Sequence, residues 1–422
     1  MQARGERSLL LGAVPFHRER GSDRRGAGAQ AVLVALQHCM LMGYYDAVVE
    51  LAHRSYALLD WAEQPEECWR VTSKLTMAYA AMGRPDEADA LYDQACMQTT
   101  LPKIHLHAAY GRAMLNTRFF PPERRDRAKA KAQINTAIAL SSQLPDAQRR
   151  AFDLSFNENG LALIETYLGD SEKALALVDG GIARVEGELA DDTLLLHRSV
   201  LRYNRAQLLS RMGRLDEALA AYGEAIEADP NQSEYHLERG DLLRRLGRHE
   251  DALTDYDAAI ATSPPYPEPH HARADLALEL GDEDAALAGF SYVLELDPAL
   301  VDARVARVSL LLERGELDAA RNDVEAGLEL HSESAELHAL RASIAQAQGR
   351  FDDAHEAYAE ALGCDPALAA ALSNRASLWY EQGELQRAIE DLTAAAQLDD
   401  DPDIRANLEY VRAAAREQPS RA

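Results

Sequence analysis

One spacing dominates this sequence: similar residues recur every 34 positions along its second half. Six blocks follow one another without insertion, with glycine at the fifteenth place of each block and alanine at the twentieth. These blocks are 199–232, 233–266, 267–300, 301–334, 335–368 and 369–402. Self-similarity at such a period predicts a repeat architecture, in which every unit buries its apolar face against its neighbours.

The repeated residues predict a helical hairpin in each block. Glycine tolerates a left-handed backbone and so ends the first helix, whereas the prolines at the thirty-second place of four blocks stop the second helix. A small eighth residue and the alanine let the two helices approach closely, and a mostly aromatic twenty-fourth residue fills the space between hairpins. The glycines are Gly213, Gly247, Gly281, Gly315, Gly349 and Gly383, and the alanines are Ala218, Ala252, Ala286, Ala320, Ala354 and Ala388.

Together these positions resemble the tetratricopeptide repeat, a 34-residue helix–turn–helix unit. The resemblance covers 199–402 and implies an all-α fold, a right-handed α-solenoid. Residues 403–422 should form a capping helix and a short tail, with Leu408 and Val411 facing inward. A solenoid needs such a cap because its last hairpin has no neighbour.

The pattern continues upstream with less regularity, over 29–198. Gly83, Ala88 and Tyr92 reproduce the spacing in a block at about 69–102. Further hairpins are predicted over 29–62, over 103–148 and from about 150 to Glu188, which makes about ten hairpins in all. Residues 1–28 are rich in arginine, glycine and alanine, and we expect them to be a basic, disordered tail.

Composition narrows the possible partners and the location. The formal net charge is -26, which disfavours nucleic acid and anionic membranes over most of the surface. No run approaches the roughly 20 apolar residues that a membrane helix needs. The four cysteines lack metal-binding spacing, so we expect reduced, mostly buried thiols in a cytoplasmic protein. The frequent use of arginine and alanine is typical of a high-GC bacterial source.

The resemblance also implies where a partner binds. In the family, the first helix of each hairpin lines the concave face, and here its exposed positions are acidic or polar from about 234 to 302. Such a face could bind a basic or amide-rich segment of a partner protein or peptide. The same residues are equally expected on an ordinary solvent-exposed helix surface that binds no partner. The expected partner-binding residues are Tyr203, Asn204, Gln207, Glu234, Glu238, Asp241, Glu268, His271, Asp275, Asp302 and Asn374.

Two groups of cations allow two interpretations each. The seventh residue of every block is arginine, and this ladder either pairs internally, with acids such as Asp255, Asp323 and Asp391, or reads an acidic ligand. The cluster from Arg124 to Lys131 is either a solvated helix start or an anion site. The ladder consists of Arg205, Arg239, Arg273, Arg307, Arg341 and Arg375.

No catalytic, cofactor-binding or metal-binding motif is present. His105 and His107 are two apart, and His270 and His271 are adjacent, so neither pair would share one face of a helix. We therefore expect a non-catalytic scaffold or adaptor without a cofactor. A ligand-responsive regulatory solenoid is the alternative, and a component of a biosynthetic pathway is the less favoured one. The oligomeric state is not predicted.

Overall fold

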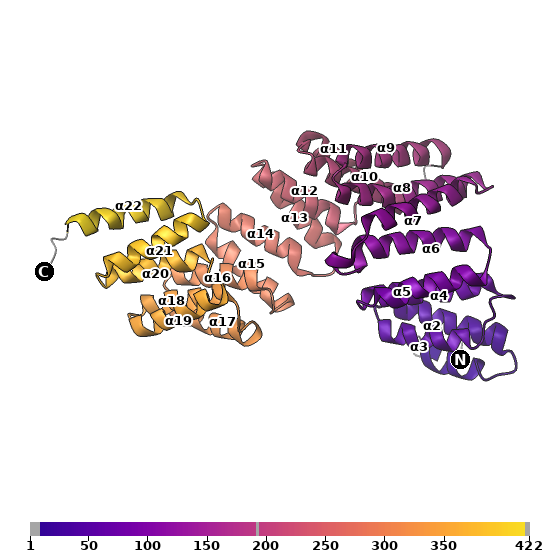
Figure 1. Ribbon diagram of the computed structural model, residues 1–422, viewed down its shortest axis with the longest axis horizontal. Coiled ribbons are helices and arrows are strands. Elements are labelled where there is room, and N and C mark those ends of the chain that lie inside the picture. The colour runs from indigo at the N-terminus through magenta and orange to yellow at the C-terminus, as the bar shows by residue number, and fades with distance from the viewer. Residues whose placement is uncertain (1–8, 191–193, 418–422) are drawn as a thin grey trace. The chain divides into compact units, whose positions relative to one another are not determined.

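The computed structural model describes residues 9–190 and 194–417. The described residues form twenty-two α-helices and a few short 3-10 and π-helical turns, and contain no strand. Consecutive helices pair as hairpins, and the hairpins stack on one another (Figure 1). The expected all-α repeat solenoid is confirmed.

The chain divides into two compact units, which we call unit 1 (Met1–Pro230) and unit 2 (Asn231–Ala422). The division follows the first of the six regular blocks. The elements of unit 1 are η2 (Leu9–Ala13), α1 (Val14–Arg18), η3 (Arg24–Gly28), α2 (Ala29–Leu41), α3 (Tyr45–Tyr56), α4 (Pro65–Ala81), α5 (Pro85–Gln98), α6 (Pro102–Met114), η4 (Leu115–Phe119), η5 (Pro122–Arg124), α7 (Arg127–Ser142), α8 (Ala147–Leu168), α9 (Ser171–Glu188), α10 (Leu195–Arg211) and α11 (Leu215–Ala228).

Unit 2 consists of five regular hairpins and a final helix. Each first helix covers the first thirteen places of its block, and each second helix starts at the seventeenth. The elements are α12 (Ser233–Arg245), α13 (His249–Thr262), α14 (Pro267–Glu279), α15 (Glu283–Leu296), α16 (Val301–Glu313), α17 (Leu317–Leu330), α18 (Ala335–Ala347), α19 (Phe351–Cys364), α20 (Ala369–Glu381), α21 (Leu385–Leu398) and α22 (Pro402–Glu417).

The turn glycine adopts the left-handed backbone that the sequence predicts. At Gly281 the φ angle is +77°, and the next amide, of Asp282, donates to the carbonyl of Ala277 at 2.9 Å. This bond satisfies a carbonyl that the helix end would leave without a partner. The glycines at the same place of the other five regular blocks also have positive φ.

The small and aromatic positions form the core between hairpins. The twentieth-place alanines are fully buried, and so are the twenty-fourth-place side chains such as Tyr256 and Phe290. A Cβ added at Gly240 would lie 2.7 Å from the ring of Tyr256, so glycine is required opposite that tyrosine. The last helix, α22, buries Ile404, Leu408 and Val411 against α21 and closes the apolar end of unit 2, as predicted for a cap.

The structure differs from the sequence prediction near the N-terminus. Residues 9–28, expected to belong to a disordered tail, form η2, α1 and η3; residues 1–8 lie outside the described part. Val14 is buried, and the buried carboxylate of Glu19 accepts a hydrogen bond from Nε of Arg54 at 3.0 Å. Composition alone missed this segment because its few anchoring side chains sit among exposed polar ones.

Candidate functional site

Unit 1 contains a large apolar groove, of about 910 Å³, on the first helices of consecutive hairpins. We call it the unit 1 groove. Each helix contributes side chains three or four residues apart, which share one helix face. Its lining comes mainly from Leu33, Leu36, Gln37 and Met40 of α2, Trp69, Arg70, Ser73, Lys74 and Met77 of α4, His107, Tyr110 and Met114 of α6, Arg118 and Phe119 of η4, and Arg149, Phe152, Asp153 and Phe156 of α8.

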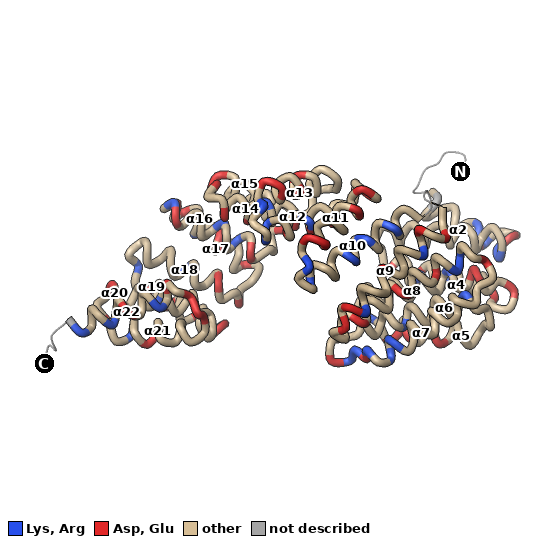
Figure 2. The backbone as a smooth tube through the Cα atoms, turned by 90° about the horizontal axis from the view of Figure 1, so that it is seen from above, with Lys and Arg blue, Asp and Glu red and all other residues tan. Residues whose placement is uncertain are grey.

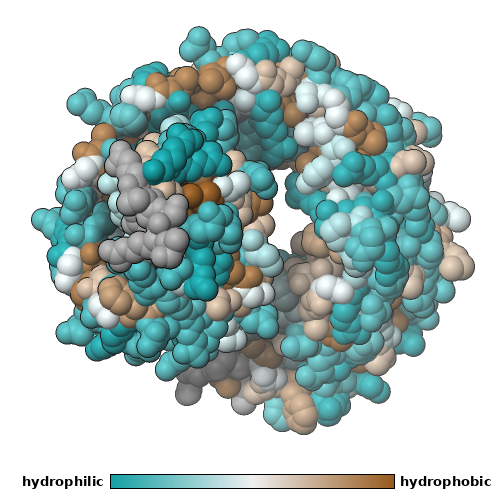
Figure 3. All heavy atoms as spheres, turned by 60° about the vertical axis from the view of Figure 1, so that its left-hand side comes forward, coloured by the Kyte–Doolittle hydropathy of each residue, from teal (hydrophilic) through white to brown (hydrophobic). Residues whose placement is uncertain are grey.

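Large apolar side chains in this groove remain open to solvent. Met77 is 48% exposed, Phe119 is 44% exposed and Phe156 is 37% exposed. Aromatic contacts hold the wall in place, since the ring centroids of Phe156 and Tyr110 are 4.7 Å apart. The face drawn in Figure 3 is mostly hydrophilic, with hydrophobic residues in small separate groups. Grouped, exposed apolar side chains in a hollow are a typical feature of binding sites.

The charged residues of the groove are mainly cationic. Arg70, Lys74, Arg118 and Arg149 line it, and Asp153 is the single acid among its lining residues. Nε of Arg149 donates to Asp153 at 2.7 Å, so that pair is neutral overall. The groove is therefore basic on a chain whose formal net charge is -26.

A distorted turn brings Arg118 and Phe119 to the groove. The α6 helix runs into the π-helical turn η4, and Phe120 is buried behind it. The guanidinium of Arg125 holds the turn by donating to the carbonyls of Phe120 at 2.8 Å and Arg118 at 3.0 Å. The following Pro121 and Pro122 prevent a regular helix from continuing.

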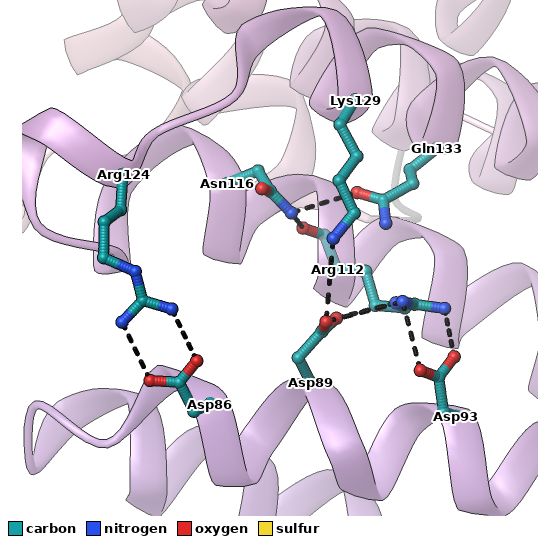
Figure 4. Close-up of polar contacts among 8 residues, drawn as sticks. All are labelled: Asp86, Asp89, Asp93, Arg112, Asn116, Arg124, Lys129 and Gln133. Atoms are coloured by element: carbon teal, nitrogen blue, oxygen red, sulfur yellow. Dashed lines mark hydrogen bonds and ion pairs between the residues drawn. The ribbon is translucent and has the colours of Figure 1, made fainter.

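The basic cluster at Arg124–Lys131 is paired internally (Figure 4). Arg124 makes two hydrogen bonds to Asp86, at 2.6 and 3.0 Å. Lys129 lies 3.7 Å from Asp89, which also accepts from Arg112 at 2.7 Å. Lys131 in turn contacts the buried Glu165 at 2.8 Å. The cluster thus joins α5, η5 and α7, and the interpretation as an anion site loses its support.

The arginine ladder is also paired internally, as one of its two interpretations predicts. Arg239, Arg307 and Arg375 each donate two hydrogen bonds to an aspartate sixteen residues later in the same block. The aspartates are Asp255, Asp323 and Asp391. Arg205 pairs with Asp179, Arg273 with Asp257 and Arg341 with Glu360.

Two of these aspartates are held by more than one base. Asp323 accepts from Arg307 and also from Arg304, whose side chain is 7% exposed, at 2.6 Å each. Burial alone would raise the pKa of Asp255, but hydrogen bonds from Arg239 and His236 lower it overall. These pairs hold the first helix of a block to its second helix.

Five of the predicted partner-binding residues line one hollow of about 820 Å³ in unit 2, which we call the acidic hollow. They are Asp241, Glu268, His271, Asp275 and Asp302. Glu268 and Asp302 are exposed, whereas the hydrogen bond with Asp275, at 3.2 Å, raises the pKa of His271. Arg244 also lines the hollow and binds Glu279 at 2.6 Å. Basic residues are interspersed with acidic ones along the helices (Figure 2).

Other predicted residues lie away from this hollow. Tyr203 is buried and accepts a hydrogen bond from Gln207 at 2.8 Å, while Asn204 donates to Asn159 at 2.9 Å. Asn374 is an exposed residue of α20. Glu234 and Glu238 are on α12 but do not line the acidic hollow.

Histidine and cysteine side chains form no group of metal-ligating residues in the described ranges 9–190 and 194–417. Nε2 of His105 bonds to the carbonyl of Thr99 at 2.7 Å, and His107 stacks on Trp69 with centroids 6.1 Å apart. Cys68 is buried and Cys364 is exposed. None of the described helices combines the length and the apolarity that crossing a bilayer requires.

The unit 1 groove was not predicted as a site. Its key side chains, Met77, Phe119 and Phe156, come from three helical segments with no common sequence period. A usable signal exists within single helices: Arg70, Lys74 and Met77 are three or four residues apart on one face of a helix, and no acid follows them on that face.

Comparison with protein families identifies the repeat. A model of the Tetratricopeptide repeat matches residues 203–267 and 339–403, and a second Tetratricopeptide repeat model matches residues 69–94. These matches fall in the regular blocks and in the upstream block predicted at about 69–102. No curated protein matches the chain in sequence.

Several solved structures are similar to parts of the chain. A tetratricopeptide repeat protein from Parabacteroides merdae has 20% identity and a TM-score of 0.47, over 63% of this chain and 99% of its own. PilF of Pseudomonas aeruginosa has 15% identity and a TM-score of 0.44, over 55% of this chain and 100% of its own. TTC0263 of Thermus thermophilus has 22% identity and a TM-score of 0.38, over 43% of this chain and 99% of its own. Because identities and TM-scores are low, we draw no functional inference from these structures.

Proposed function

We propose that this tetratricopeptide-repeat protein is a non-catalytic scaffold that holds a polypeptide segment of a partner protein in the unit 1 groove. The observation that carries the proposal is the group of solvent-exposed apolar side chains, Met77, Phe119 and Phe156, in one hollow. Covering them removes apolar surface from water, which is favourable at roughly 25 cal/mol per Å² before the costs of association.

The shape of the groove favours an extended ligand. Its lining comes from α2, α4, α6 and α8, the first helices of four consecutive hairpins. At a typical helix spacing of roughly 9 Å, four such helices span on the order of 30 Å. A peptide of about nine extended residues covers that length.

The acidic hollow in unit 2 is the second candidate surface, and it suits a basic or amide-rich segment. Glu268 and Asp302 are exposed there, and neither forms a hydrogen bond or ion pair with another described residue. Asp241 is less suited to a partner because it already accepts a hydrogen bond from the hydroxyl of Tyr256 at 2.8 Å.

The test is affinity purification of the full chain from its native host, with quantitative mass spectrometry. The groove variant is Met77→Glu with Phe119→Glu, and the hollow variant is Glu268→Lys with Asp302→Lys. Met97→Glu with Leu280→Glu is the matched control, because both residues are exposed apolar residues outside the two sites. We expect one partner to be lost with the groove variant and retained with the control.

Each other outcome changes the proposal in a definite way. Loss with the hollow variant alone would move the site to unit 2. A partner retained by every variant would refute both surfaces. If no partner is captured but a metabolite raises the melting temperature of the wild type and not of the groove variant, the ligand-responsive regulator replaces the scaffold.

A further inference from the structure

We propose that the unit 1 groove selects an acidic, amphipathic segment of its partner: apolar side chains cover Met77, Phe119 and Phe156, while carboxylates pair with Arg70, Lys74 and Arg118. This inference rests on the proposed scaffold function and adds the chemistry of the segment. It also reverses the expectation from the acidic composition, which favoured a basic partner for the chain as a whole.

The first step is that three cations of the groove have no internal partner. The side chains of Arg70, Lys74 and Arg118 form no hydrogen bond or ion pair with another residue in 9–190 or 194–417. In the same unit, Arg112, Arg124 and the other bases of the network in Figure 4 are all bound to carboxylates. Three of the unpaired cations of unit 1 therefore line the groove, whereas others, such as Lys103 and Arg211, lie outside it.

The second step is the position of these cations. Arg70 and Lys74 are one turn apart on α4, beside Met77, and Arg118 precedes Phe119 on η4. Each exposed apolar side chain of these two elements thus has a cation close to it in the chain. A ligand that alternates apolar and acidic residues would match both features along the groove.

The third step is that a single carboxylate would use only part of this arrangement. The cations come from two helical segments, and the apolar surface extends further to Phe152 and Phe156 of α8. A small aromatic acid engages one cation and one apolar contact, whereas a polypeptide segment with several acids engages all of them. Exposed ion pairs each contribute little, so several are needed for selectivity.

The experiment is selection of a random short-peptide display library on the purified full chain, followed by calorimetry with the enriched peptides. The charge-reversed variant is Arg70→Glu, Lys74→Glu and Arg118→Glu. The matched control is Lys103→Glu, Arg211→Glu and Arg416→Glu, which makes the same change in net charge at exposed positions outside the groove.

We expect the enriched peptides to combine aromatic or aliphatic residues with aspartate or glutamate. The charge-reversed variant should weaken their binding by about tenfold or more, the control should not, and added salt should weaken wild-type binding. Circular dichroism of both variants shows whether each remains folded.

The outcomes separate this inference from the proposed function. Enriched peptides without acidic residues, lost only with Met77→Glu and Phe119→Glu, would overturn the acidic selectivity and leave the scaffold intact. Peptides insensitive to all groove variants would overturn both. If indole-3-acetate raises the melting temperature of the wild type but not of the charge-reversed variant, and no peptide binds, the ligand is a small carboxylate and the inference is wrong.

Discussion

Unit 1 and unit 2 are built from the same hairpin but use their charges differently. In unit 2, the arginines of the ladder hold helices together through aspartates such as Asp255 and Asp323. In unit 1, Arg70, Lys74 and Arg118 face an apolar groove and hold nothing internally. Arginines such as Arg112 also join helices in unit 1, so the difference lies in the three groove cations, to which our proposal gives a role in recognition.

The largest expected difference concerns buried carboxylates. Asp323→Ala leaves the buried Arg304 without a carboxylate partner, although it keeps its bonds to backbone carbonyls, and we expect a loss of about 3–5 kcal/mol in unfolding free energy. Glu165→Ala in unit 1 should cost less, because Lys131 and Lys173 remain within reach of solvent. Urea unfolding followed by circular dichroism measures both losses. Equal losses of unfolding free energy would contradict the expected difference between the buried carboxylates of the two units.

The next effect is a pH dependence that originates at His197 in unit 1. Desolvation lowers the pKa of His197 to about 4, between Phe152 and Phe156. From pH 6.5 down to about 4 the unfolded chain binds a proton that the native chain does not, so stability falls with falling pH, by roughly 2–3 kcal/mol.

His197→Gln should reduce this slope when unfolding free energy is measured between pH 7 and pH 4, and a part should remain because burial also lowers the pKa of His107 and of His270. The control His53→Gln changes an exposed histidine of α3 and should leave the slope in place. A slope that persists unchanged in His197→Gln would assign the acid sensitivity to other groups.

A smaller effect should be shared by the two units, because the turns are the same. Gly83 in unit 1 and Gly281 in unit 2 have φ angles of +71° and +77°. Replacement by alanine puts a Cβ on a left-handed residue, and we expect about 1–2 kcal/mol of destabilisation at either site. Thermal melts of Gly83→Ala and Gly281→Ala should agree; a large difference would show that the hairpins are less alike than their backbones indicate.

The smallest effect is expected at the surface of the network in Figure 4. Arg124 and Asp86 are both exposed, so Arg124→Ala should leave the urea midpoint nearly unchanged. The less exposed side of the same network gives the comparison: Arg112→Ala leaves Asp89 and Asp93 without their shared partner and should lower the midpoint measurably. If Arg124→Ala were the more harmful, the pair with Asp86 would be what holds η5 in place.

The periodic residues made the fold predictable from the sequence. A turn glycine, a buried alanine and an aromatic each have one packing role, so their spacing places the helices of every block. Internal pairing of the arginine ladder was one of the two interpretations of the sequence for the same reason, since Arg239 and Asp255 belong to one block. In both cases the partners are close in sequence and recur.

The groove required the structure because its parts do not recur. Phe119 reaches it through the π-helical turn η4, and neither the turn nor its direction is encoded by a repeat. The segment 9–28 was missed for a related reason, since Glu19 meets Arg54 of α3, 35 residues later, only in the folded chain. Some acids of the predicted partner-binding face already have internal hydrogen-bond partners, as Asp241 has in Tyr256.

The ladder arginines differ in where their acids lie in the sequence: Arg341 binds Glu360 of its own block, and the arginines of three other blocks also bind an acid of their own block. The blocks that begin at 233, 301 and 369 each contain the aspartate that binds their own arginine, whereas Arg273, in the block between the first two, depends on Asp257 of the preceding block. A genetic deletion of 267–300 would therefore leave every remaining arginine of this kind with its acid. Deletion of 233–266 would remove Asp257 and leave Arg273 without its acid. Recombination between blocks is thus tolerated unequally: loss of a block such as 335–368 removes an arginine together with its acid, whereas loss of 233–266 separates a pair that spans two blocks.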